Sequence, residues 1–152
     1  MDTDDLSLLL NQAREFFEYE GKRYAVKELT VVQLAQLSTW LKERAAQQIE
    51  LMTWLPEARR DRMYNDLRDV CALGRYDPGG DIFAQLQFQR DGIVKSLHLC
   101  IEADHPSFTL EDCEKMVDAK AVKVAEAIIK ANPIDPKASW AHQEGSPGGV
   151  TS

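Results

Sequence analysis

The chain has 152 residues, of which 44% are hydrophobic and 28% charged, with 18 lysines and arginines against 25 aspartates and glutamates. This length suits one domain of ordinary size, and the apolar share is typical of a globular protein rather than a disordered one. The net charge of −7 makes nucleic acid a poor general partner. No run of ~20 apolar residues is present, so the sequence predicts no membrane-spanning helix.

The N-terminus and the cysteines both indicate the cytoplasm. Residues 1–5 are acidic where a secretory signal is basic, so we expect no export. The three cysteines are odd in number and scattered, which suits free thiols in a reducing compartment. Residues 6–13 are rich in leucine and can form a short helix or an arm.

An antiparallel hairpin is expected over about residues 15–28. Aromatic and β-branched residues alternate with charges on both sides of Gly21, which supplies the positive φ of a tight turn. A pair of strands is not stable alone, so it must pack on the rest of the chain. The expected packing face consists of Phe17, Tyr19, Tyr24 and Val26.

Two helices are predicted next. Thr30 is a suitable N-cap for a long amphipathic helix over residues 31–55, in which leucines and other apolar residues recur at steps of three and four. Pro56 ends this helix and opens a second one, which stops at Gly74. The inner face of the second helix is expected to consist of Met63, Leu67, Val70 and Cys71.

Two further helices complete the predicted fold. Asp81 can cap a third helix running to about Ala103, with Gly92 a weak point inside it. Thr109 can cap a fourth helical stretch that runs to about Ala131, with room for a break near residues 118–120. The sequence thus predicts a mainly α fold, with an N-terminal antiparallel hairpin followed by a compact bundle of about four to five helices.

One domain boundary is expected. Residues 1–132 form a single globular domain in this interpretation, with helices to residue 131. Residues 133–152 are rich in proline and glycine and have little to bury, so they are predicted to be a disordered tail that is dispensable for folding.

No pattern in the sequence predicts catalysis, a cofactor or a metal. Gly21-Lys22 lacks the other residues of a phosphate-binding loop. The one metal-like group has no close ligand pair of the kind zinc sites use, and its cysteines fall on inward helix faces where thiols are inert. That group is His98, Cys100, His105 and Cys113. We expect a protein that is not an enzyme.

The second predicted helix carries both signs of charge. Its arginines could contact phosphate, but aspartates alternate with them and favour ion pairs along the helix surface instead. The arginines are Arg59, Arg60, Arg62 and Arg68, and the aspartates are Asp61, Asp66 and Asp69.

A candidate partner-binding surface lies on the first long helix. Trp40, Leu51 and Trp54 fall to one side of its main apolar stripe and are flanked by glutamines and glutamate. An apolar edge with a polar border is typical of a groove rim. The alternative is that Trp40 and Trp54 belong to the core or its edge.

The order of these features resembles one protein family. An aromatic hairpin, Phe17-x-Tyr19-x-Gly21-Lys22-x-Tyr24-x-Val26, precedes Leu29-Thr30 and a helix with Leu37, Trp40 and Leu41. Thr109-Leu110-Glu111-Asp112 and Ala127-Ile128-Ile129 follow later. Over roughly Phe16 to Ala131 this pattern is similar to the small tail assembly chaperones of tailed bacteriophages and prophages.

The resemblance implies a non-catalytic helper that acts in the host cytoplasm. Members of the family bind the tape-measure protein, a long and largely helical chain, and keep it soluble until the tail tube polymerises around it. The tail tube protein is a further candidate partner, and many members also have a longer, frameshifted form. Two alternatives stay open: a structural virion component, such as a head–tail connector or tail-completion protein, and a small helical regulator that binds DNA through residues 59–68.

Overall fold

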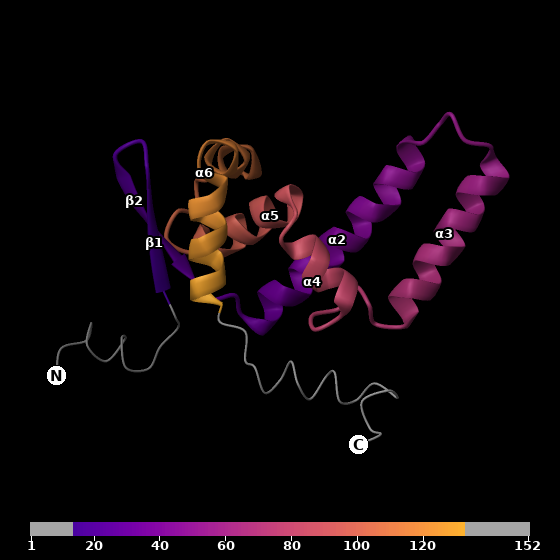
Figure 1. Ribbon diagram of the computed structural model, residues 1–152, viewed down its shortest axis with the longest axis horizontal. Helices are drawn as coiled ribbons and strands as arrows, with labels where there is room; N and C mark the ends of the chain where they lie inside the picture. Colours follow the sequence, from indigo (N-terminus) through magenta and orange to yellow (C-terminus); the bar gives the residue numbers. More distant parts are fainter. Residues whose placement is uncertain (1–13, 133–152) are drawn as a thin grey trace, which may run out of the picture.

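The computed structural model describes residues 14–132. A β-hairpin packs beside helices α5 and α6, while α2 and α3 run side by side and extend away from them (Figure 1). This is the mainly α architecture that the sequence predicts, with one N-terminal hairpin. The predictions for residues 1–13 and for the tail from 133 to 152 fall outside the described residues.

The hairpin consists of β1 (Arg14–Tyr19) and β2 (Lys22–Lys27), paired antiparallel with Phe17 opposite Tyr24. Glu20 and Gly21 form the turn, with φ of 49° and 76°. Two left-handed residues are the signature of the type I′ turn, whose twist matches that of the strands. The hairpin predicted around Gly21 is therefore confirmed.

One face of the hairpin is part of the core. Phe17, Tyr24 and Val26 are buried, and the rings of Phe17 and Tyr24 stack with centroids 5.5 Å apart. Tyr24 also meets the rings of His105 and Phe108 edge-on, at 5.0 and 5.3 Å. These contacts supply the support that an isolated pair of strands lacks.

Helix α2 spans Val31–Leu51 and starts at a capping box. The Thr30 hydroxyl accepts from the Gln33 backbone N–H at 3.1 Å, and the Thr30 N–H donates to the Gln33 side chain at 3.0 Å. Thr30 is thus confirmed as the N-cap. The helix ends four residues earlier than expected, and a turn of residues 52–56 leads to α3 (Glu57–Ala72).

The expected third helix is divided into α4 (Asp81–Gln87) and α5 (Arg90–Ile101), so the prediction of one continuous helix is wrong. The break allows the start of α5 to fold closely against the end of α4. A Cβ added at Gly92 would lie 2.0 Å from the Leu86 carbonyl oxygen, so only glycine fits there. Asp81 is the first residue of α4 rather than its cap, which is Gly80.

Helix α6 (Leu110–Ala131) starts at Thr109, the expected N-cap, which forms a capping box with Asp112. It bends at Lys120, whose φ and ψ of −137° and 39° are not helical, which confirms the break expected near residues 118–120. Arg90 holds Asp118 beside this bend with two hydrogen bonds of 2.8 and 2.9 Å. The segment after the bend runs along β1 (Figure 1).

The core lies where α5, α6, the hairpin and the first half of α2 meet. Its fully buried side chains include Leu37, Leu97, Ile101, Met116 and Ile128. Within residues 14–132, no helix has both the length and the apolar character needed to cross a membrane.

Candidate protein-binding surface

The α2–α3 pair forms an arm with a fixed base and a free end. At the base, the Ser38 hydroxyl donates to the Tyr76 carbonyl at 2.8 Å, and Lys42 pairs with Asp77 at 2.9 Å. From Ser38 to the end of α2 at Leu51 the helix rises about 20 Å. Of the helices and strands in the described part of the chain, α3 contacts α2 alone. Helix α3 therefore has no described helix or strand other than α2 to support it, whereas α2 packs on the core as far along as Ala45.

Two of the three candidate residues lie together at the tip of the arm. Leu51 is the last residue of α2, and Trp54 is in the turn that follows. Their exposed fractions are 72% and 74%. A tryptophan this exposed is not part of the core, so the core interpretation of Trp54 is wrong and its partner-binding role stays a prediction.

Trp40 lies at the other end of the arm. It precedes Leu51 by about three helical turns, so it is on the same side of α2 but about 16 Å away along the axis. Its ring is partly buried at the edge of the core, and the Arg44 guanidinium lies 5.2 Å from the ring centroid. The structure therefore places Trp40 apart from the other two candidates.

Trp40 separates two hollows on the base of the arm. One, of about 100 Å³, also has Arg44, Tyr76 and Gly92 in its wall. The other is more open, about 400 Å³, and is lined by Val32, Thr39 and Lys95 among others. Arg44 forms an ion pair with Asp91 beside the first hollow, so its charge is already matched there.

Helix α3 has an apolar face that α2 covers incompletely. None of its 16 residues is fully buried. The residues expected on its inner face are half-buried, and Tyr64, Leu67 and Cys71 also line an open hollow of about 700 Å³ on the arm. The sequence predicted this apolar face, but it did not predict that α2 covers only part of it. An apolar stripe has the same spacing whether one helix or two pack against it.

The charges of α3 are arranged differently from the prediction. Among residues 14–132, none of the ion pairs involves an arginine of this helix. The side chains of Arg59, Arg62 and Arg68 are exposed instead. Acidic and basic residues still alternate along the helix, so it carries no continuous basic surface of the kind that nucleic acid attracts.

The two buried cysteines of the described region are not activated. Cys100 and Cys113 are buried, and burial raises the pKa of each thiol to about 12. Both therefore stay protonated at neutral pH. His98 contacts the Phe108 carbonyl with its Nε2 at 3.0 Å, and His105 packs on Tyr24. Within residues 14–132, no three histidines, cysteines or acidic residues are placed to hold a metal ion.

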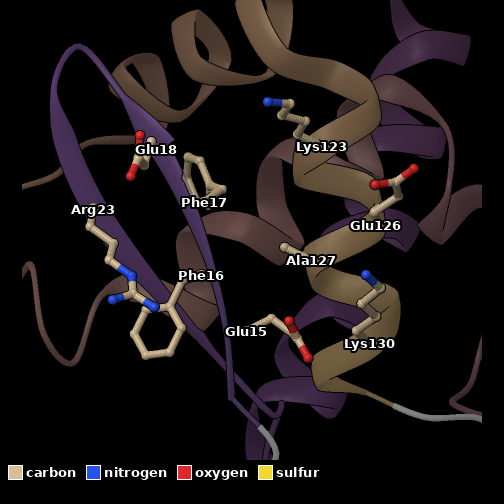
Figure 2. Close-up of a pocket in the computed structure, with 9 residues that line it drawn as sticks. All are labelled: Glu15, Phe16, Phe17, Glu18, Arg23, Lys123, Glu126, Ala127 and Lys130. Atoms are coloured by element: carbon tan, nitrogen blue, oxygen red, sulfur yellow. The ribbon is translucent and has the colours of Figure 1, made fainter.

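A groove that the sequence analysis missed lies between β1 and the last part of α6 (Figure 2). Its volume is about 420 Å³. The signal available in the sequence was the adjacent pair Phe16-Phe17, because neighbouring strand residues face opposite sides and one of two aromatics must leave the core. Phe16 is 47% exposed, with the Arg23 guanidinium 4.0 Å from its ring centroid.

Comparisons of the chain with family models, curated proteins and solved structures give no significant match.

Proposed function

We propose that this protein is a non-catalytic tail assembly chaperone of a tailed bacteriophage or prophage. In this proposal it binds the tape-measure protein in the host cytoplasm and assists assembly of the tail tube. The observation that carries the proposal is the projecting α2–α3 arm, with a half-covered apolar face and with Leu51 and Trp54 exposed at its tip.

A two-helix arm is suited to a helical client. Two helices can cover only one side of each other, and the hollow beside Leu67 and Cys71 leaves part of the apolar face of α3 open, bordered by Asp61, Asn65 and Arg68. A third helix packed along this face would complete a small bundle, as in recognition of a helix by a groove. A largely helical tape-measure protein presents such helices repeatedly.

The tip supplies the side chains expected of an anchor. Tryptophan is prominent among residues that dominate binding energy, and exposed apolar surface reduces solubility if it has no partner. The backbone of the tip is ordered by hydrogen bonds, including Leu55 N–H to the Met52 carbonyl at 3.1 Å. The backbone that carries Trp54 is therefore ordered before binding, which lowers the backbone entropy lost when a client docks.

The test is co-expression with the tape-measure protein of the phage or prophage to which this proposal assigns the chain. We expect wild type to keep that client soluble and to co-purify with it, and the double variant Leu51→Ala/Trp54→Ala to lose both properties with an unchanged melting temperature. Leu73→Ala is the matched control, because Leu73 is 76% exposed but follows α3 at the base of the arm. Its variant should behave as wild type.

Two outcomes would contradict the proposal. If wild type neither solubilises nor captures the client, the chaperone function fails, and recovery of the protein from purified virions would then identify a structural virion component. If the chain instead retards DNA in a salt-dependent manner, and charge reversal of Arg59 and Arg62 abolishes that shift, a regulator is the better description.

A further inference from the structure

The groove between β1 and α6 has two chemically different walls. Figure 2 shows the strand on one side and the helix on the other, with Phe17, Lys123 and Ala127 directed between them. The strand wall includes four consecutive residues of β1, from Glu15 to Glu18. Consecutive residues point to alternate faces, so a hollow that touches all four must follow the edge of the strand.

That edge carries backbone groups that β2 does not use. The type I′ turn closes on the hydrogen-bonded pair Tyr19–Lys22, and hydrogen-bonded pairs alternate with non-hydrogen-bonded pairs along the ladder. The N–H and C=O groups of Phe16 and Glu18 therefore point away from β2. Within residues 14–132 they make no other backbone hydrogen bond.

We propose that this groove binds an extended peptide segment of a partner protein, which adds to β1 as a third strand. The backbone of this segment can form hydrogen bonds with the outward N–H and C=O groups of Phe16 and Glu18, as in strand addition to an open sheet edge. The site is separate from the arm, and the proposal does not depend on the chaperone function.

The geometry favours a single strand as the occupant of the groove over a helix or a second copy of this chain. A helix is 10–12 Å wide and has no free backbone groups along its side, so it cannot pair with the edge. The hairpin of a second copy would bring a second strand and its own helix α6 toward the same edge. Because α6 already lines the groove beside this edge, the helix of a second copy would compete with it for the same space, whereas a single strand brings no helix.

The side chains on the walls indicate the sequence of the occupant. Phe17 and Ala127 form an apolar floor, so side chains on that side of the added strand should be apolar. Glu15 and Glu18 on β1 and Lys123 and Lys130 on α6 line the same groove. Among the described residues, none of these four is in an ion pair. Charged side chains of either sign can therefore be matched. The expected ligand alternates apolar with charged residues.

The test uses a displayed library of random dodecapeptides selected on the full-length protein, followed by fluorescence polarisation of the synthesised consensus peptide. Glu18→Pro removes the outward N–H of β1 without removing a bond of the ladder, and proline is tolerated at such an edge. Ala25→Pro is the matched control, because Ala25 is paired with Phe16, its N–H faces the opposite edge, and it does not line the groove.

We expect an alternating consensus that binds Glu18→Pro at least tenfold more weakly than wild type and that binds Ala25→Pro within about threefold of wild type. Bound peptide should also slow amide exchange at Phe16 and Glu18 in the wild type. If Glu18→Pro does not fold, the exchange measurement decides together with the double variant Lys123→Glu/Lys130→Glu. The double variant should select peptides without the acidic residues that the two lysines match in the wild type.

Three results would overturn the proposal. The first is a library that yields no peptide, or one whose binding leaves exchange at Phe16 and Glu18 unchanged. The second is competition by a synthetic peptide of residues 133–152, which would make this chain its own occupant. The third is a dimer in solution that Glu18→Pro abolishes, which would make the occupant a second copy.

Discussion

The two tryptophans of the arm are expected to respond differently to the same substitution. Trp40 lies partly buried at the edge of the core, whereas Trp54 is 74% exposed at the tip. Truncation of a fully buried tryptophan to alanine costs ~3–5 kcal/mol. Because hollows border Trp40 on two sides, less packing is lost there, and we expect Trp40→Ala to lower the free energy of unfolding by about 2–3 kcal/mol.

Part of this loss comes from Arg44. Its guanidinium lies 5.2 Å from the Trp40 ring centroid, a cation–π contact worth ~0.5–1 kcal/mol at a partly exposed site. The ion pair of Arg44 with Asp91 does not need the ring and should persist. Trp54→Ala removes neither packing nor a charge contact of this kind, so its effect should stay within ~0.5 kcal/mol, as for other surface substitutions.

Urea unfolding followed by circular dichroism measures both variants. Trp40→Ala should shift the midpoint with an unchanged m-value, and its melting temperature should fall by about 4–12 °C, from ~2–4 °C per kcal/mol for a chain of this size. Trp54→Ala should melt with wild type. If Trp40→Ala is as stable as Trp54→Ala, the Trp40 ring contributes nothing to the core and the packing argument is refuted.

Three other predictions concern the body of the fold. Gly92→Ala should cost about 3 kcal/mol or more and lower the melting temperature accordingly, because the new Cβ would meet backbone at 2.0 Å. Hydrogen bonds from Arg75 lower the pKa of Asp81 to about 2. The ionised Asp81 carboxylate therefore stabilises the folded state fully above its unfolded pKa near ~4, and this stabilisation is lost as the pH falls toward 2. The unfolding free energies of wild type and Asp81→Asn should differ at pH 7 and converge near pH 2. Iodoacetamide at pH 8 should modify the partly exposed Cys71 in the folded protein, but Cys100 and Cys113 only in urea, and peptide mass spectrometry measures each site. Fast labelling of Cys100 and Cys113 without urea would contradict the burial that raises the pKa of both thiols.

Local chemistry explains the parts of the fold that were predictable from sequence. The capping boxes at Thr30 and Thr109 satisfy backbone groups within three residues of the cap. The turn at Gly21 requires left-handed residues at two adjacent positions. Each of these signals is complete within a few consecutive residues, so no distant part of the chain is needed to interpret it.

The division between α4 and α5 was not predictable in the same way. The apolar spacing from Phe83 to Ile101 suits one helix as well as two. What separates them is the close approach of Gly92 to the Leu86 carbonyl, which depends on how the two segments pack. A glycine inside a helical pattern indicates a weak point, but the sequence does not show which backbone atom takes the space of its missing side chain.

The candidate partner-binding surface was also predictable only in part from the sequence. The sequence by itself determined that Trp40 and Leu51 lie to one side of a long amphipathic helix, because helical periodicity fixes the side of each residue, but it wrongly extended that helix over Trp54. Only the tertiary structure decided that Trp40 joins the core edge while Leu51 and Trp54 stay exposed, and that β1 leaves an open edge beside α6. Periodicity specifies direction around one helix axis, whereas burial depends on how far neighbouring elements extend along that axis, and here the core stops at the base of the arm.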